Sequence, residues 1–357
     1  MNRKWVVFIS VFCFIFVGWV LNISGAIFKK DFFWLDPIKG VDLYNLDPLF
    51  YYISDDGATC GGYYVYKESV YLAALYTGNN LVKLQSLGGL ESCIFGGSDN
   101  NVFIGWALDQ DGSSYPVSWD ISGKINKLIN YEGKALGISY NGQYIVGWYD
   151  DELGNFTPFI YDYKINNFQK LSNLYVGNYK EAYINSVNDS KNMCGRIKSV
   201  DDESSVPFLY LDGKTFIPAG ISEGAFYQIS NNNKVVGYIV NKTNEESESY
   251  NAVVFENNQV KKIFDDNRFS IAYSISKDGK VVAGYFQDPT DNNYVKPFIY
   301  YNNKVINLEE KLKTYLSDGS FLEKVVRVSS NGNWVIGVGY NNAIYQPFAA
   351  DISNLIK

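Results

Sequence analysis

The sequence contains no histidine among its 357 residues. Ser–His–Asp and Cys–His catalysis, histidine metal ligation and histidine-based pH sensing are therefore excluded. Charge is also sparse, since charged residues make up 19% of the chain, and 31 basic against 38 acidic residues give a formal charge of −7. Nucleic-acid binding needs a basic face, so we expect no nucleic-acid partner. We also expect no metal and no cofactor.

Cysteine is scarce as well. Of four cysteines, Cys13 lies in an apolar run near the start, which leaves Cys60, Cys93 and Cys194 for the rest of the chain. Three thiols allow at most one internal disulfide. In an exported protein Cys60 and Cys93 are the candidate pair, because the repeats described below place them on neighbouring units. Cys194 is interpreted as a small core residue.

The first 26 residues have the layout of a secretory signal peptide. Arg3 and Lys4 precede an apolar stretch from Trp5 to Ile23, and the small residues Ser24, Gly25 and Ala26 follow. This pattern predicts cleavage after Ala26. The stretch is also long enough to span a bilayer, so an uncleaved N-terminal membrane anchor stays open. Both alternatives predict export to the periplasm, the cell surface or the medium, with membrane contact only through this segment if it is uncleaved.

The strongest signal is an internal repeat. AYSISKDGKVVAGYF, from Ala272, matches ALGISYNGQYIVGWY from Ala135, FYQISNNNKVVGYIV from Phe226 and VVRVSSNGNWVIGVGY from Val325. Three weaker copies begin at Phe50, Cys93 and Tyr183. The closing glycines of the seven copies are Gly61 (or Gly62), Gly105, Gly147, Gly195, Gly237, Gly284 and Gly337. A second string follows each glycine, as in the Pro-Phe pairs that begin at Pro158, Pro207, Pro297 and Pro347.

Each copy has the pattern of a four-stranded meander. The Ile-Ser-x-Asn/Asp-Gly stretch places turn residues between two β-rich runs, which indicates a hairpin. The Val-Val-Gly-Tyr run is apolar on both faces, as expected for a strand between packed sheets. Its glycine indicates a bulge or a close backbone approach. Only the segment from Leu308, LEEKLKTYL, has the apolar spacing of a short helix.

Seven such units predict an all-β fold, a β-propeller of seven four-stranded blades. The last copy has three strands and no fourth, whereas VDLYNL, from Val41, precedes the first copy and has no other assignment. We therefore expect this N-terminal strand to close the ring. The predicted organisation is a signal peptide or anchor over residues 1–26, a linker over 27–40 and the propeller over 41–357.

The motif Ala-x-x-Ile-Ser-x-Asn/Asp-Gly-x-x-Val-Val-Gly-Tyr, followed by a Phe-centred strand, resembles the HAF-repeat family of putative extracellular bacterial proteins. The resemblance extends from about Val41 to Asp351. The His-Ala-Phe triplet that names the family is replaced here by Pro-Phe. The resemblance implies a propeller-like repeat and an extracellular location, and it implies no catalytic activity.

Aromatic residues follow the repeat glycine in five copies: Tyr63, Trp106, Trp148, Tyr238 and Tyr285. Repetition at one register favours packing between blades, and a sugar-binding ring of aromatics is the alternative. Arg196 interrupts the series with a charge. The candidate ligand-binding residues are therefore Arg196, Trp106 and Trp148.

Two functions fit these features. The first is an exported, noncatalytic binding or scaffold module for a protein or a surface glycan. The alternative is a glycan hydrolase or lyase with an acidic site in the propeller channel, and no single pair of carboxylates in the sequence stands out as catalytic. Convergence of Asp, Glu, Tyr or Arg from several blades on one mouth of the channel would favour the enzyme.

Overall fold

The computed structural model describes residues 31–36, 46–66, 70–78, 80–152, 154–174, 179–199, 204–244, 247–266, 268–288 and 291–357. The predicted signal segment lies outside these residues. From Phe32 to Lys357 the chain forms one compact unit. No helix among the described residues is long and apolar enough to cross a membrane.

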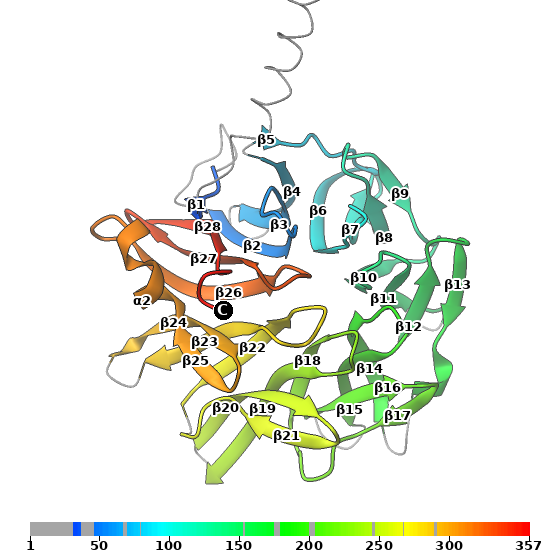
Figure 1. The fold of residues 1–357 in the computed structure, drawn as a ribbon. Helices are drawn as coiled ribbons and strands as arrows, with labels where there is room; N and C mark the ends of the chain where they lie inside the picture. The colour runs from blue at the N-terminus through cyan, green and yellow to red at the C-terminus, as the bar shows by residue number, and fades with distance from the viewer. Residues whose placement is uncertain are drawn as a thin grey trace, which may run out of the picture. The chain divides into compact units, whose positions relative to one another are not determined.

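The fold is a β-propeller of seven four-stranded antiparallel sheets, as predicted (Figure 1). Blade 1 contains β2 (Leu46–Ile53), β3 (Thr59–Tyr66), β4 (Val70–Thr77) and β5 (Asn80–Leu81). Blade 2 contains β6 (Gly88–Gly97), β7 (Phe103–Asp109), β8 (Ser114–Trp119) and β9 (Ile125–Lys127). Blade 3 contains β10 (Gly133–Ile138), β11 (Tyr144–Asp150), β12 (Phe156–Asp162) and β13 (Asn167–Lys170). Blades 4 and 5 contain β14 (Tyr179–Val187), β15 (Met193–Ser199), β16 (Ser205–Leu211) and β17 (Lys214–Phe216); and β18 (Gly224–Ile229), β19 (Val235–Asn244), β20 (Ser247–Glu256) and β21 (Gln259–Lys262).

Blades 6 and 7 contain β22 (Ser270–Ile275), β23 (Val282–Asp288), β24 (Asp291–Tyr301) and β25 (Lys304–Asn307); and β26 (Phe321–Val328), β27 (Trp334–Asn341), β28 (Ile344–Asp351) and β1 (Phe32–Trp34). The short helix α2 (Leu308–Leu312) joins them and continues as a 3-10 turn (Lys313–Tyr315), as the spacing of LEEKLKTYL predicts. Asn307 caps it by accepting from the backbone N–H of Glu310.

The first strand of each blade is the innermost, since these seven strands contact one another around the ring axis. The core consists of apolar side chains from facing sheets of adjacent blades. Val146 and Ile160 of blade 3, for example, pack against Ile184, Val187 and Phe208 of blade 4. The Phe of each Pro-Phe string is fully buried there, as Phe208 shows.

The ring is closed by an N-terminal strand, but a different one from that expected. β1 pairs antiparallel with β28, with Phe32 opposite Ala350 and Trp34 opposite Phe348. It therefore lies inside the segment predicted to be a linker. Of the VDLYNL string, Leu46 begins β2 and residues 41–45 lie outside the described residues. Three apolar residues suffice for this strand because an outermost strand pairs along one edge only. A run of three residues is too short to be recognised as a strand from the sequence.

The repeat glycine explains a bulge that recurs in every blade. A Cβ on Gly147 would lie 2.0 Å from the carbonyl oxygen of Lys134 on the inner strand, and one on Gly237 would lie 2.0 Å from that of Ala225. Just beyond each glycine, the register of the inner strand shifts by one residue. The extra residues of the seven bulges are Tyr51, Phe95, Leu136, Asn185, Tyr227, Tyr273 and Val326.

Phe32 should carry much of the closure. Its side chain is 7% exposed, and its ring lies 5.8 Å from that of Phe348. We expect Phe32→Ala to lower the free energy of unfolding by about 3 kcal/mol, because it removes a buried ring. The loosened edge of blade 7 should also promote self-association. Thermal melting and light scattering measure both effects, and Leu90→Ala, at a side chain that is 89% exposed, is the control. A Phe32→Ala protein that melts at the wild-type temperature would show that β1 does not hold the ring.

Candidate functional site: the ring axis and its two faces

The Ser-x-Asn/Asp-Gly turns join the first and second strands of the blades on one face of the ring, here called the turn face. In blade 3, Ser139 Oγ accepts a hydrogen bond from Tyr144 N at 2.9 Å, and Asn141 Oδ1 accepts one from Gln143 N at 2.9 Å. Gly142 takes φ = +72°, which favours glycine. Every residue of the motif except x therefore builds the turn, and x can vary.

The x residues converge at the axis. One comes from each blade, and together they form what we call the axial cluster: Asp55, Asp99, Tyr140, Asp189, Asn231, Lys277 and Ser330. Neighbouring turns bond to one another directly, since Asn231 N donates to Lys277 O at 2.9 Å and Lys277 N donates to Ser330 O at 3.0 Å. The cluster is thus held by the backbone as well as by side chains.

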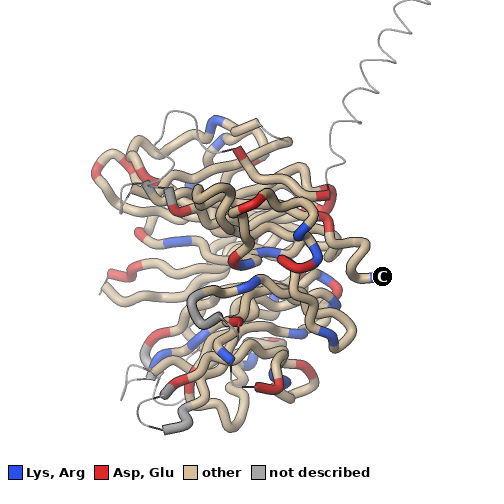
Figure 2. The backbone as a smooth tube through the Cα atoms, turned by 90° about the vertical axis from the view of Figure 1, so that its left-hand side faces the viewer, with Lys and Arg blue, Asp and Glu red and all other residues tan. Residues whose placement is uncertain are grey.

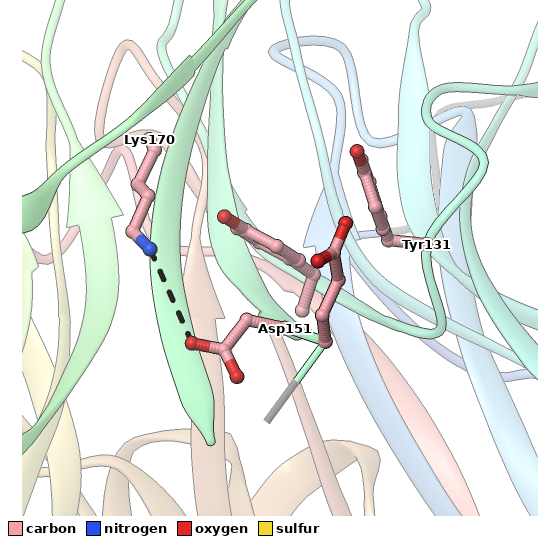
Figure 3. A pocket seen from close by; sticks show the side chains of 5 residues that line it. Tyr131, Asp151 and Lys170 are labelled. Carbon is pink, nitrogen blue, oxygen red and sulfur yellow. Dashed lines mark ion pairs between the residues drawn. The ribbon is translucent and has the colours of Figure 1, made fainter. Parts of the chain in front are cut away.

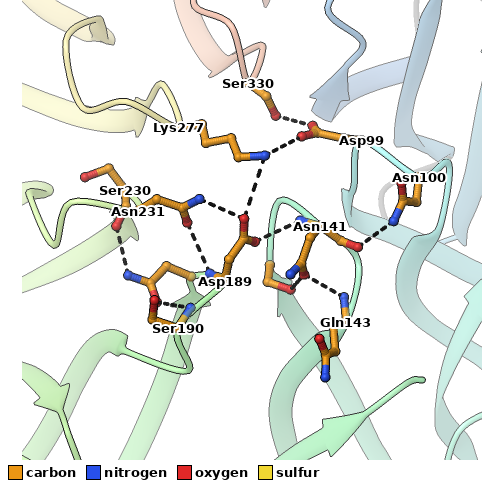
Figure 4. Close-up of polar contacts among 12 residues, drawn as sticks. Asp99, Asn100, Asn141, Gln143, Asp189, Ser190, Ser230, Asn231, Lys277 and Ser330 are labelled. Carbon is orange, nitrogen blue, oxygen red and sulfur yellow. Dashed lines mark hydrogen bonds and ion pairs between the residues drawn. The ribbon is translucent and has the colours of Figure 1, made fainter. Parts of the chain in front are cut away.

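Lys277 is the centre of the cluster (Figure 4). Its Nζ lies 3.0 Å from an Asp99 carboxylate oxygen and 3.7 Å from one of Asp189, so it links blade 6 to blades 2 and 4. Ser330 Oγ donates to the other oxygen of Asp99. Asn231 Nδ2 donates to Asp189 at 2.7 Å. Burial alone would lower the pKa of Lys277, but Asp99 and Asp189 outweigh it and the pKa is raised.

Tyr140 lies next to this ion bridge, with its ring centroid 6.0 Å from Lys277 Nζ. Its hydroxyl donates to the carbonyl of Ile275, in blade 6, at 2.9 Å and accepts from Gln228 Nε2, in blade 5, at 3.0 Å. Ser274 Oγ donates to Gln228 Oε1 at 2.7 Å. A buried tyrosine from blade 3 therefore joins three blades across the middle of the ring.

Three carboxylates from three blades meet at this mouth, which is the convergence that would favour an enzyme. Each of them already has partners. Asp99 and Asp189 share the ammonium of Lys277, and Asp55 accepts from Asn331 N at 2.7 Å. Burial raises the pKa of Asp55, and the backbone of Asn331 opposes that shift. Two carboxylates that share one ammonium are held in ion pairs, and this arrangement suits a structural clasp better than an acid–base pair.

A second feature lies toward the other ends of the strands in blades 5 and 6. Six aromatic side chains form a closed cycle of ring contacts, with centroids 5.0 to 5.9 Å apart. This aromatic patch consists of Tyr227, Tyr238, Tyr250, Phe269, Tyr273 and Tyr285. All six are half-buried. Because each ring contacts two others, the patch is a preformed surface.

The three predicted ligand-binding residues have different surroundings. Trp106 is buried, and its ring carries the ammonium of Lys134 at 4.5 Å. Trp148 is half-buried and packs edge-on against Phe156 with centroids 4.6 Å apart. Trp106 therefore packs within the protein, whereas Trp148 keeps an exposed part, and its partner Phe156 contacts Tyr183 with centroids 6.4 Å apart. Arg196 is exposed and lies at 4.9 Å over the ring of Tyr183. Its charge opposes the rise that burial causes in the pKa values of Tyr227 and Tyr238. It borders the aromatic patch.

The candidate disulfide is not formed. Cys60, Cys93 and Cys194 are free and buried. Cys60 packs toward blade 7, against Ile336 and Ala349, while Cys93 packs with Tyr63 and Trp106. Their side chains thus enter separate core clusters, and burial raises the pKa of both thiols. Adjacent blades bring these two strands together, but the alternation of side chains along each strand keeps the sulfurs apart.

A pocket of about 270 Å³ lies on blade 3 (Figure 3). It is lined by Tyr131, Tyr149, Asp151, Glu152 and Lys170, with a Lys170–Asp151 ion pair at 4.0 Å. All of these residues belong to one blade and the segment before it. Acidic and basic residues are interspersed along the described chain in Figure 2, so surface charge does not single out this pocket.

Sequence reasoning missed most of the two features. The axial cluster occupies the most variable position of the turn motif, and a comparison of that position in all seven copies would have identified it. Tyr227 and Tyr273 are bulge residues, so their orientation depends on a register shift. The repeat glycine indicated a bulge or a close backbone approach, but not which residue would be displaced. Tyr250 and Phe269 lie outside the repeat motif.

Lys277 provides a test of the clasp. Lys277→Met leaves Asp99 and Asp189 facing each other without a cation, so we expect a loss of about 1 kcal/mol in unfolding free energy at neutral pH. The folded pKa of Lys277 is raised, so its contribution is present below the pKa of an unfolded lysine and disappears as pH rises through the folded value. Melting curves of the variant and wild type should converge there. Lys280→Met is the control, because the ion pair of Lys280 among the described residues is with Asp278 in its own turn. Equal stability of Lys277→Met and wild type would contradict the clasp.

Comparisons with known proteins bear on the fold. No protein-family model and no curated protein matches the chain. Among solved structures, oligogalacturonate lyase from Vibrio parahaemolyticus is similar, with 11% identity and a TM-score of 0.55 over 91% of this chain and 98% of that one. A puromycin-hydrolyzing peptidase of Mycobacterium tuberculosis matches with 10% identity and a TM-score of 0.53 over 86% of this chain and 51% of that one. The β-propeller domain of the trilobed protease from Pyrococcus furiosus matches with 13% identity and a TM-score of 0.47 over 67% of this chain and 75% of that one. At these identities the likeness concerns the fold alone.

Proposed function

We propose that this chain is an exported, noncatalytic propeller that binds a surface glycan through the aromatic patch and Arg196. The observation that carries the proposal is the closed cycle of six half-buried aromatic rings beside an exposed guanidinium. Export is proposed from the signal-like residues 1–26, which also agrees with the resemblance to the HAF-repeat family.

The chemistry of the patch suits a sugar. Five of its six members are tyrosines, which combine an apolar ring face with a hydroxyl that donates and accepts. Sugar rings likewise have C–H faces and hydroxyl edges. Burial raises the pKa of Tyr227, Tyr238, Tyr273 and Tyr285, so their hydroxyls stay protonated at neutral pH. Arg196 adds several donors at the border.

Rigidity supports binding as well. Tyr273 and Tyr285 are hydrogen-bonded to each other, and Tyr227 and Tyr273 are extra residues of bulges that the repeat glycines require. A ligand would therefore meet side chains that are already in place, and binding would cost little side-chain ordering.

Binding to a panel of neutral and acidic oligosaccharides tests the proposal. We expect Tyr238→Ala to weaken the affinity of a bound glycan at least tenfold, as removal of a central aromatic contact does at other recognition surfaces. Arg196→Gln should weaken it less. Tyr131→Ala removes an exposed aromatic outside the patch and should leave the affinity unchanged. Isothermal titration calorimetry measures all three.

Failure of the whole panel to bind, or binding that Tyr238→Ala leaves unchanged, would contradict the glycan proposal and favour a protein partner. The convergence of Asp55, Asp99 and Asp189 keeps the enzyme as the second candidate. The same panel distinguishes it, because release of reducing ends or of unsaturated products that stops in Asp99→Asn would overturn the noncatalytic proposal.

A further inference from the structure

Arg327 is the one charged side chain at its position in the repeat. It lies two residues before the turn serine, directly after the bulge of β26, and pairs with Ile336 of β27. The corresponding residues of blades 1 to 6 are uncharged: Tyr52, Gly96, Gly137, Ser186, Gln228 and Ser274.

The polar side chains at this position, those of Tyr52, Ser186, Gln228 and Ser274, have hydrogen-bond partners, whereas the side chain of Arg327 has none among the described residues. Tyr52 Oη donates to Ser98 O at 3.2 Å, and Ser274 Oγ donates to Gln228 Oε1 at 2.7 Å. Across the part of the chain that the structure describes, no carbonyl, hydroxyl or carboxylate accepts a hydrogen bond from Arg327, and its interactions are limited to longer-range electrostatic ones. The five N–H donors of the guanidinium are therefore available.

Arg327 lies on β26, the innermost strand of blade 7, next to the ring axis. The groups that act on it electrostatically come from three other blades: Tyr140 of blade 3, Tyr52 of blade 1 and Asp99 of blade 2. The side chain is enclosed by protein yet only half-buried, so it keeps a surface that solvent reaches. Burial lowers the pKa of Arg327 from its usual value, which reflects the cost of keeping an unpaired charge there.

Asp99 does not neutralise Arg327 directly. One of its oxygens is bound to Lys277 at 3.0 Å and the other accepts from Ser330. The hydroxyl protons of Tyr52 and Tyr140 are likewise donated to carbonyls of other blades. The guanidinium is thus the one group at this level whose donors all remain open among the described residues.

We propose that Arg327 binds a single carboxylate group on the ring axis. The planar fork of a guanidinium matches a carboxylate with two parallel hydrogen bonds. A single negative charge suits the surroundings better than two, since the carboxylate of Asp99 acts on Arg327 and would repel a dianion more strongly than a monoanion. The site uses none of the residues of the aromatic patch, so carboxylate binding at Arg327 can be tested independently of glycan binding at the patch.

Arginine side-chain NMR tests the site with acetate as the probe. After removal of residues 1–26 the chain has three arginines, Arg196, Arg268 and Arg327, so its Nε–Hε spectrum is simple. Titration with sodium acetate at constant ionic strength should move the Arg327 signal saturably. Arg268, which pairs with Asp266, should not move and is the internal control. Sodium chloride and sodium phosphate should act at least tenfold more weakly.

Two variants complete the test. Arg327→Met should abolish the acetate-dependent rise in melting temperature, whereas Arg268→Gln should keep it. Without acetate, Arg327→Met should melt no lower than wild type, because the charge that is removed is half-buried and has no partner. A purely structural guanidinium would instead make the variant less stable. Arg327→Lys keeps the charge and loses the fork, so its acetate affinity should fall.

An unmoved Arg327 signal, an equal response to chloride or phosphate, or an unchanged acetate effect in Arg327→Met would overturn the proposal. So would a less stable Arg327→Met protein whose stability is independent of acetate.

Discussion

The close approach of the repeat glycine to the inner strand is the contact on which the rest of the ring depends. In each blade a hydrogen atom takes the place of a Cβ that would lie on a carbonyl oxygen of the inner strand, at 1.9 Å in the case of Gly284 and Ile271. The inner strand then takes up one extra residue and bulges. Seven such bulges turn seven side chains out of the regular alternation, at the inner edge of the ring.

This constraint separates scaffold from candidate function. The serine and the Asn or Asp of the turn hydrogen-bond within the turn, as Ser139 and Asn141 do. The Phe of the third strand fills the core between blades. What varies between blades is the turn residue at the axis and the bulge residue. Tyr140 and Lys277 occupy the turn position and belong to the clasp, and Tyr227 is a bulge residue that belongs to the patch.

Much of the fold could be predicted because the same strand and turn pattern occurs in seven copies. Strand number, strand order and the glycine bulge all follow from local patterns that recur. The prediction of the closing strand was wrong because Phe32–Trp34 is short and its partner β28 is more than 300 residues away. Only the tertiary fold identifies this strand. The site was harder to predict for the same reason. Whether Trp106 is buried and Arg196 exposed depends on what the neighbouring blade places over each of them, and no single repeat contains that information.

The adjacent glycines Gly61 and Gly62 allow the most direct measurement, since the sequence alone did not distinguish them. A Cβ on Gly62 would lie 2.3 Å from Leu49 O, whereas one on Gly61 would make its nearest contact at 3.4 Å, with Ile94 Cγ2. Equilibrium unfolding should therefore show a loss of roughly 3 kcal/mol for Gly62→Ala. Gly61→Ala should stay within about 1 kcal/mol of wild type. Equal stabilities of the two variants, or a greater loss for Gly61→Ala, would contradict the proposed dependence of the ring on the glycine contact.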